Sequence, residues 1–347
     1  MATIRSLERD DLPALAQLLR TNLGWRRDED ALERTLLAHP WALEPVPTLV
    51  ALGDDGEIIG SLGAQARRVI FDGSPLRAVA VSHLVVDARR RGGAAGALLV
   101  RELLAGGQDL TWTDSGTAEV VRIWRAFGAH VDHTRSANWM LVLRPIRWLS
   151  RVAMAPGEVR RNLAPVGALP LQAGGRRLIA RAFPEPEQGV RGEDASPPQV
   201  AELLPDLAKG IRLRVDYDSG YLSWLHDHVS SLGAPIVYRV VRRADRAIGW
   251  YAYIRQPGVS RVVHLSAPVR EVDAVFGELV AHTHATGSAL LTGRLEPHVD
   301  EPVRQRLAAI GLTQRPLVHA RDPELRATLA SSAALLTEMD LIDSEWW

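Results

Sequence analysis

The chain has no cysteine in its 347 residues and a single lysine, Lys209. Without cysteine, the protein can form no disulfide, no thiolate metal site and no cysteine nucleophile. It also has no Gly-Lys-Ser/Thr sequence, which a P-loop for nucleoside triphosphates requires. The formal net charge is zero, so we expect no nucleic-acid partner.

Long apolar segments are missing as well. No apolar run approaches the roughly 20 residues of a membrane span, and the charged N-terminus does not resemble a signal peptide. We therefore expect a cytoplasmic protein with no membrane contact. Two of the histidines, His282 and His284, are two positions apart on a predicted helix and face different sides. Because no other histidine spacing suits a metal either, we expect no metal site.

The most informative stretch runs from Val81 to Leu104. An apolar, β-branched strand leads into three arginines and a loop of only glycine and alanine, and an amphipathic helix follows at once. Unpaired backbone N–H groups and the helix dipole make such a helix start an anion site, and small side chains let a phosphate come close. The spacing of Gly92, Gly93 and Gly96 does not fit the G-x-G-x-x-G loop of dinucleotide-binding folds.

This loop resembles the signature of the GNAT superfamily of acyl-CoA-dependent N-acyltransferases. The family pattern is Arg/Gln-x-x-Gly-x-Gly/Ala, and the chain has Arg91-Gly-Gly-Ala94-Ala-Gly96, with Ala94 in place of a glycine. The elements expected before and after it follow the order β-α-α-β-β-β-β-α-β-α-β, which the GNAT fold uses. The loop comes after the fourth strand of that order.

The second half of the chain looks like a repeat of the same plan. The hairpin from Ile236 to Ile254, the strand Val262–Ala267 and the helix Glu271–Thr286 match elements of the first half, and a helix is expected over Val303–Ile310. The resemblance therefore implies two tandem GNAT-like domains, each an α/β (α+β) mixed, mostly antiparallel sheet flanked by helices. We expect an N-terminal domain at 1–145, a connector at 146–198 and a C-terminal domain at 199–347.

The C-terminal copy is expected to be degenerate. Ser266-Ala-Pro-Val-Arg-Glu271 stands where the first half has its glycine loop, and Pro268 removes one N–H donor. We expect this copy to lack a coenzyme A site.

The resemblance implies acetyl-CoA or another acyl-CoA as co-substrate. The pyrophosphate would accept N–H bonds from the loop, and the pantetheine arm would lie along the end of the strand, where a main-chain N–H could polarise the thioester carbonyl. The residues expected to bind the acyl-CoA are Leu84, Val85, Val86, Arg90, Arg91, Gly92, Gly93, Ala94, Ala95 and Gly96.

Amine attack on a thioester needs a base and an acid. His83, in the strand beside the expected thioester, is the first candidate base because its ordinary pKa of about 6.5 suits the task. Asp114, after the next strand, is the second. Many GNAT enzymes use a tyrosine acid at a position that here holds Trp124, so a hydroxyl such as that of Ser115 or Thr117 is an alternative.

The resemblance thus implies transfer of an acyl group, most simply acetyl, to an amine of a small molecule or amino sugar. Two alternatives remain open: a non-catalytic acyl-CoA-binding or regulatory module, and an aminoacyl or peptidyl transferase of tandem-GNAT type. A homodimer is possible in each case.

Overall fold

The computed structural model describes residues 2–25, 28–41, 47–90, 92–154, 187–306, 308–312 and 314–341. The chain forms two compact units. The first comprises Met1–His133, Arg212–Trp224 and Arg315–Trp347, and the second comprises Thr134–Ile211 and Leu225–Gln314. Most of the expected connector 146–198 lies outside the described residues.

The first unit contains a nine-stranded mixed sheet with the order β1-β2-β3-β4-β5-β15-β6, to which β9 and β16 are joined through β3. Only two pairings, β4 with β5 and β9 with β16, are parallel. The strands are β1 (Thr3–Ser6), β2 (Leu49–Leu52), β3 (Ile58–Phe71), β4 (Ser74–Val86), β5 (Leu110–Thr113), β6 (His130–Val131), β9 (Leu213–Val215), β15 (Leu317–Ala320) and β16 (Ala334–Leu335).

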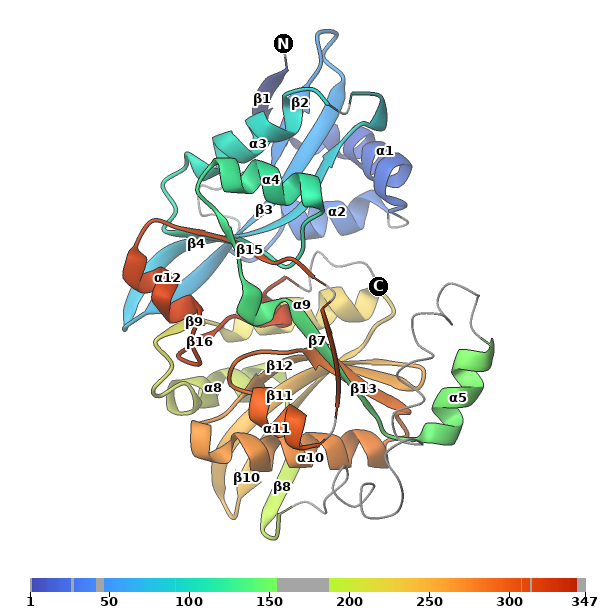
Figure 1. The fold of residues 1–347 in the computed structure, drawn as a ribbon, viewed down its shortest axis with the longest axis vertical. Helices are drawn as coiled ribbons and strands as arrows, with labels where there is room; N and C mark the ends of the chain where they lie inside the picture. Colours follow the sequence, from blue (N-terminus) through green and yellow to red (C-terminus); the bar gives the residue numbers. More distant parts are fainter. Residues whose placement is uncertain are drawn as a thin grey trace. The chain divides into compact units, whose positions relative to one another are not determined.

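Helices cover both faces of this sheet (Figure 1). On one face α1 and α2 enclose a core with Val50 and Val85, and on the other α3 and α4 enclose a core with Leu62 and Val81. The helices are α1 (Leu12–Leu23), α2 (Glu29–Leu36), α3 (Ala95–Leu104), α4 (Ala118–Ala126) and α12 (Pro323–Leu329), with 3-10 turns η1 (Arg9–Asp11), η2 (Ala88–Arg90) and η5 (Glu338–Asp340). A further 3-10 turn, η3 (His133–Arg135), begins in the first unit and ends in the second.

Local sequence signals explain several boundaries. The side chains of Asp28 and Thr117 accept hydrogen bonds from backbone N–H groups in the first turns of α2 and α4, so each caps its helix. The turn between β3 and β4 has Asp72 at φ +49° and Gly73 at φ +82°. Asp-Gly tolerates these positive φ values, which tight hairpin turns require.

The second unit contains a seven-stranded sheet with the order β14-β7-β13-β12-β11-β10-β8, in which only β12 and β13 pair in parallel. Helix α10 covers one face, where Val275 and Leu279 pack on Tyr251. The elements are β7 (Ala137–Val142), α5 (Pro145–Met154), β8 (Val190–Asp194), α8 (Pro197–Leu207), β10 (Ile236–Arg243), β11 (Arg246–Gln256), β12 (Val259–Ser266), η4 (Val269–Glu271), α10 (Val272–Ala285), β13 (Leu290–Arg294), α11 (Asp300–Gln305) and β14 (Ala309–Leu312). Helix α9 (Ser219–Ser231) begins in the first unit and ends in the second.

The two halves of the chain exchange a strand. Strand β7, from the first half, lies between β13 and β14 in the second sheet, and β15, from the second half, lies between β5 and β6 in the first sheet. The compact units therefore do not follow the expected boundaries at 145 and 199. Those boundaries assume that strands close in sequence pair with one another, which is a common arrangement but not a necessary one.

One helix expected in the second half of the chain differs from the observed structure. The helix expected over Val303–Ile310 is instead the short helix α11, which ends at Gln305, followed by β14. Ile310 pairs with Trp139 of β7, so tertiary pairing overrides local helix preference. Among the described residues, no helix has both the length and the apolar character that a membrane crossing requires.

Candidate active site

The first unit has an open helix start at the expected phosphate loop. Strand β4 ends at Val86, and α3 begins at Ala95 with Ala94 as its N-cap, which makes no side-chain capping bond. The N–H of Leu98 donates to Ala94 O, which is the first hydrogen bond of the helix. The N–H groups before Leu98 in the first turn therefore have no acceptor within the helix. Gly92, Gly93 and Ala94 are exposed, and Gly92 has φ +87°, which favours glycine.

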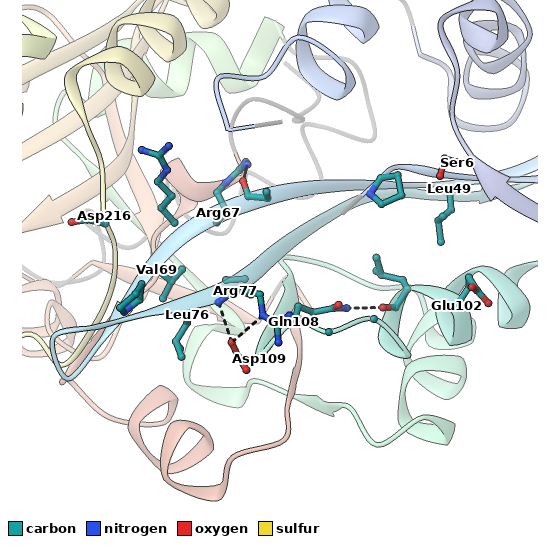
Figure 2. A pocket seen from close by; sticks show the side chains of 18 of the residues that line it. Ser6, Leu49, Arg67, Val69, Leu76, Arg77, Glu102, Gln108, Asp109 and Asp216 are labelled. Carbon is teal, nitrogen blue, oxygen red and sulfur yellow. Dashed lines mark hydrogen bonds and ion pairs between the residues drawn. The ribbon is translucent and has the colours of Figure 1, made fainter. Parts of the chain in front are cut away.

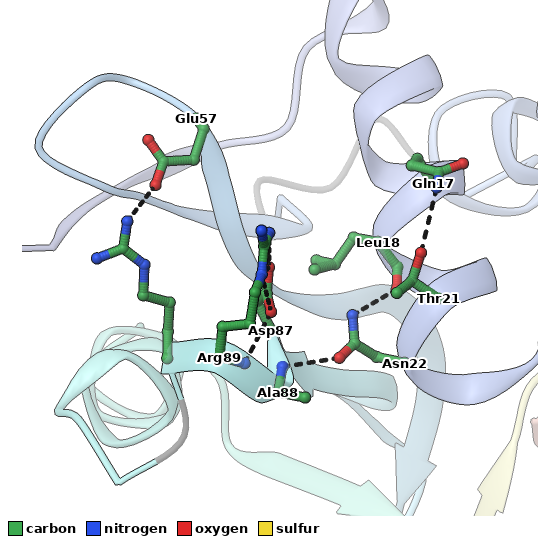
Figure 3. A network of polar contacts seen from close by, with 9 residues as sticks. Gln17, Leu18, Thr21, Asn22, Glu57, Asp87, Ala88 and Arg89 are labelled. Atoms are coloured by element: carbon green, nitrogen blue, oxygen red, sulfur yellow. Dashed lines mark hydrogen bonds and ion pairs between the residues drawn. The ribbon is translucent and has the colours of Figure 1, made fainter.

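A side chain from α1 holds the beginning of this loop (Figure 3). Asn22 Oδ1 accepts from the N–H of Ala88 at 2.8 Å, and Asn22 Nδ2 donates to Leu18 O at 3.0 Å. The backbone at the end of β4 is thereby tied to α1 by neutral hydrogen bonds. Asn22 was not among the residues predicted from the sequence, because its partner Ala88 is 66 residues away in the chain.

The arginines of the loop are paired with carboxylates (Figure 3). Arg89 Nη2 lies 2.6 Å from Asp87 Oδ2, and Arg90 Nη2 lies 2.9 Å from Glu57 Oε1. The hydrogen bonds from Arg89 lower the pKa of the Asp87 carboxyl to about 2, so it is ionised at neutral pH. Both arginine side chains are more than half exposed, which leaves them accessible to a phosphate. The third arginine, Arg91, lies outside the described residues.

Strands β4 and β5 diverge before β4 ends. Their parallel register runs from Ala78 with Leu110 to Ala80 with Trp112. Strand β5 ends at Thr113, whereas β4 continues to Val86. The end of β4 is therefore not paired with β5, and its backbone can accept a strand-like ligand on that side.

A bulge interrupts the pairing of β3 and β4 at the same place. The register shifts between Ser61 and Gly63, and His83 has φ +51°. A Cβ at position 63 would lie 2.6 Å from Ser82 Oγ and 3.1 Å from Ser82 O, so glycine is needed there. An isolated glycine within a strand often marks a bulge, so the sequence contained this signal.

After the bulge, the three residues expected beside the thioester face alternate sides of β4. Val85 is buried in the core under α1 and α2. Leu84 and Val86 are half-buried against the core under α3 and α4. Gly96 also lies near this strand, since a Cβ there would contact Val86 Cγ2 at 3.5 Å. The neighbouring Ala95 is buried in the α3 core.

His83 is held by two neighbours. Its side chain is buried, its Nδ1 lies 2.9 Å from Ser82 Oγ, and its ring meets that of Trp25 edge-on at 4.9 Å and 87°. For Nε2 to act as a base, Nδ1 must carry the proton and donate to Ser82 Oγ.

The other candidate catalytic residues follow β5. Asp114 is buried and Ser115 is exposed, both directly after the strand that diverges from β4. Thr117 caps α4 by accepting from the N–H of Val120, so its side-chain oxygen has a structural role. Trp124 is completely buried in the core with Leu99, and indole is no proton donor at useful pKa, so it cannot supply the acid.

Solved structures with the same fold give this arrangement a context. No protein-family model and no curated protein sequence matches the chain. Solved structures do match it: a protein from Enterococcus faecalis described as a probable N-acyltransferase has 11% identity and a TM-score of 0.61, covering 92% of this chain and 73% of its own. A GCN5-related N-acetyltransferase from Anabaena variabilis has 11% identity and a TM-score of 0.62, over 93% and 73% of the two chains. Eis1 from Mycobacterium abscessus has 19% identity and a TM-score of 0.57, over 95% and 76%.

The chain has a tandem GNAT fold. The predicted superfamily resemblance and fold class are confirmed at the level of fold. The expected site residues and their roles stay predictions.

The second GNAT-like unit repeats the strand geometry without the loop. Strands β12 and β13 pair in parallel as far as Val262 with Gly293, and β12 continues to Ser266. The start of α10 differs from that of α3, because its N-cap is Glu271. The buried Glu271 carboxylate lies 2.9 Å from both Arg243 Nη2 and Arg246 Nη2. Pro268 and the buried, arginine-paired Glu271 stand in place of an exposed loop of small residues, so the backbone at this helix start is less open to a phosphate.

A cavity of about 690 Å³ lies elsewhere in the first unit (Figure 2). It is lined by the early part of β4, including Leu76 and Arg77, by Glu102 near the end of α3, and by the segment with Gln108 and Asp109. The N-terminus of α3, at Ala95, is seven residues from Glu102 and therefore about 10 Å away at 1.5 Å per residue. The volume of the cavity suits a small ligand. Because the cavity does not adjoin the open start of α3, we do not assign the acyl-CoA to it.

Proposed function

We propose that the chain is an N-acyltransferase that moves an acyl group, most simply acetyl, from acyl-CoA to an amine of a small molecule or amino sugar. The observation that carries this proposal is the combination, in the first unit, of an exposed loop of small residues, Gly92–Ala94, at the start of α3 with a diverging β4–β5 pair. The second unit keeps the divergence but has Glu271 at its helix start. The tandem GNAT fold supports the same conclusion.

The pyrophosphate of the acyl-CoA would bind at the first turn of α3. Exposed Gly92, Gly93 and Ala94 leave the backbone accessible, and Ala95 and Gly96 supply first-turn N–H groups. Arg89 and Arg90 would exchange Asp87 and Glu57 for phosphate oxygens, which charge-assisted bonds favour.

The chemistry would take place beside the bulge of β4. A main-chain N–H near Leu84–Val86 would donate to the thioester oxygen while the amine nitrogen attacks the carbonyl carbon. A C–N bond forms and the C–S bond breaks. The proton released by the amine passes to His83, with Asp114 as the second candidate base, and the coenzyme A thiolate takes a proton from water or from Ser115.

Binding of coenzyme A tests the phosphate site. We expect Gly93→Glu to weaken coenzyme A binding at least tenfold, because it places a negative charge and a long side chain at the exposed loop. Isothermal titration calorimetry measures this, and thermal unfolding confirms that the variant is folded. Ser332→Glu, at an exposed position just before β16, adds the same charge near the opposite end of β3 and β4 and is the matched control. Equal affinities for wild type and Gly93→Glu would contradict the proposal.

A non-catalytic acyl-CoA-binding module is the second candidate. The buried Trp124, where many GNAT enzymes have a tyrosine acid, favours it. Thiol release from acetyl-CoA in a panel of amines distinguishes the two, with His83→Ala and Asp114→Ala as tests of the base. Binding of coenzyme A without thiol release for any amine would favour the module.

A further inference from the structure

Trp25 occupies a position that the end of α1 determines. Gly24 has φ +72°, its N–H donates to Arg20 O at 3.2 Å, and the N–H of Trp25 donates to Leu19 O at 3.4 Å. The bond from Gly24 is that of an αL C-cap, and the bond from Trp25 to Leu19 O turns the chain back so that the Trp25 side chain is directed toward the helix. The Trp25 side chain is accordingly buried, with 4% exposure, in the core that α1 and α2 form.

The indole ring lies against the bulge of β4. It meets the His83 ring edge-on at 4.9 Å, and it shares its core with Val85, two residues further along the strand. His83 and Val85 are 8% and 3% exposed, so these three side chains form a packed wall on the α1/α2 side of the strand. The wall stands next to the main-chain segment Leu84–Val86, where the proposed function places the thioester.

We propose that Trp25 limits the acyl group of the donor to a short chain, with acetyl preferred. This inference rests on the proposed acyl-CoA site. The acyl chain is expected to extend from a carbonyl held at the bulge toward the α1/α2 side. There it meets the rigid indole ring of Trp25, whose backbone N–H is held by Leu19 O. Close-packed side chains of this kind accommodate additional methylene groups poorly.

The affinities of coenzyme A, acetyl-CoA and butyryl-CoA test the proposal without knowledge of the acceptor. We expect wild type to bind acetyl-CoA at least tenfold more tightly than butyryl-CoA, because one or two methylene groups in a tight site change binding by such factors. In Trp25→Ala, the ratio of the affinity for acetyl-CoA to that for butyryl-CoA should fall at least tenfold, while the affinity for coenzyme A itself changes little. Calorimetry on the full-length chain gives all three values.

Two further variants make the test decisive. Trp25→Phe keeps an aromatic ring and should give an intermediate ratio, and it replaces Trp25→Ala if that variant does not fold. Trp41→Ala removes an equally buried tryptophan of the same unit that stacks on Tyr221 at 4.0 Å, and its ratio should match wild type. Equal binding of both donors by wild type, or an unchanged ratio in both Trp25 variants, would overturn the proposal. Failure to bind coenzyme A at all would instead refute the proposed function.

Discussion

Replacing Arg239 by methionine is expected to lower the free energy of unfolding of the second unit by about 3–5 kcal/mol. Arg239 Nη2 on β10 donates to Glu278 Oε1 on α10 at 3.1 Å, and the two side chains are 10% and 8% exposed. The other oxygen of Glu278 accepts from the Tyr251 hydroxyl at 2.6 Å. Without the arginine, a nearly buried carboxylate keeps one neutral donor, and its charge is no longer compensated.

The surroundings of Glu278 allow little relaxation. A Cβ at Gly192 of β8 would clash with Glu278 Oε1, so the carboxylate packs directly against that strand. We expect the double variant Arg239→Met/Glu278→Leu to recover most of the lost stability, because apolar side chains of similar size remove both charges from the interior.

Urea unfolding of the full-length chain, followed by circular dichroism, measures these differences. Arg242→Met is the matched control, since this arginine lies on the same strand and its partner Glu193 is 46% exposed. It should change the free energy of unfolding by less than about 1 kcal/mol. An effect of Arg239→Met no larger than this control, or a double variant as unstable as the single one, would show that the buried pair is not responsible.

The part of the site that the sequence predicted is the part built from consecutive residues. The β4–loop–α3 connection follows from a β-branched strand, a run of small residues and an amphipathic helix, all of which act locally. Its partners come from elsewhere in the chain: Asn22 is 66 residues from Ala88, and Glu57 is 33 residues from Arg90. No local pattern encodes such contacts.

The exchange of β7 and β15 has the same cause. Both β7 and β15 are apolar strands with suitable flanking turns, and their own residues do not indicate which sheet each strand joins. Local pattern predicted the strands, while their pairing with β13 and β5 depends on the complete fold. The positive φ of His83 was not predicted either, since positive φ is uncommon among non-glycine residues.

Two buried histidines are expected to make the second unit lose stability in mild acid. His264 on β12 stacks on Trp250 at 4.0 Å, and burial lowers the pKa of its imidazole well below the usual value. Burial also lowers the pKa of His298 from 6.5 to about 4. The hydrogen bond to Leu265 O raises this pKa by a smaller amount, and the charges of Arg135 and Arg294 lower it further. The nearby Glu296 carboxylate, 3.8 Å from His298 Nδ1, does not restore the usual pKa.

The direction of the effect follows from proton binding. Below pH 6.5 the unfolded chain takes up a proton at His298, but the folded unit does so only near pH 4, so the free energy of unfolding falls between these values. The difference in pKa corresponds to about 3 kcal/mol at pH 4 and below. His298→Gln does not titrate and can still donate to Leu265 O, so its loss of stability between pH 6.5 and 4.5 should be smaller than that of wild type. His284→Gln, at an exposed histidine of α10, should follow wild type in the same thermal unfolding series. Parallel curves for wild type and His298→Gln would mean that acid destabilises the unit through other groups.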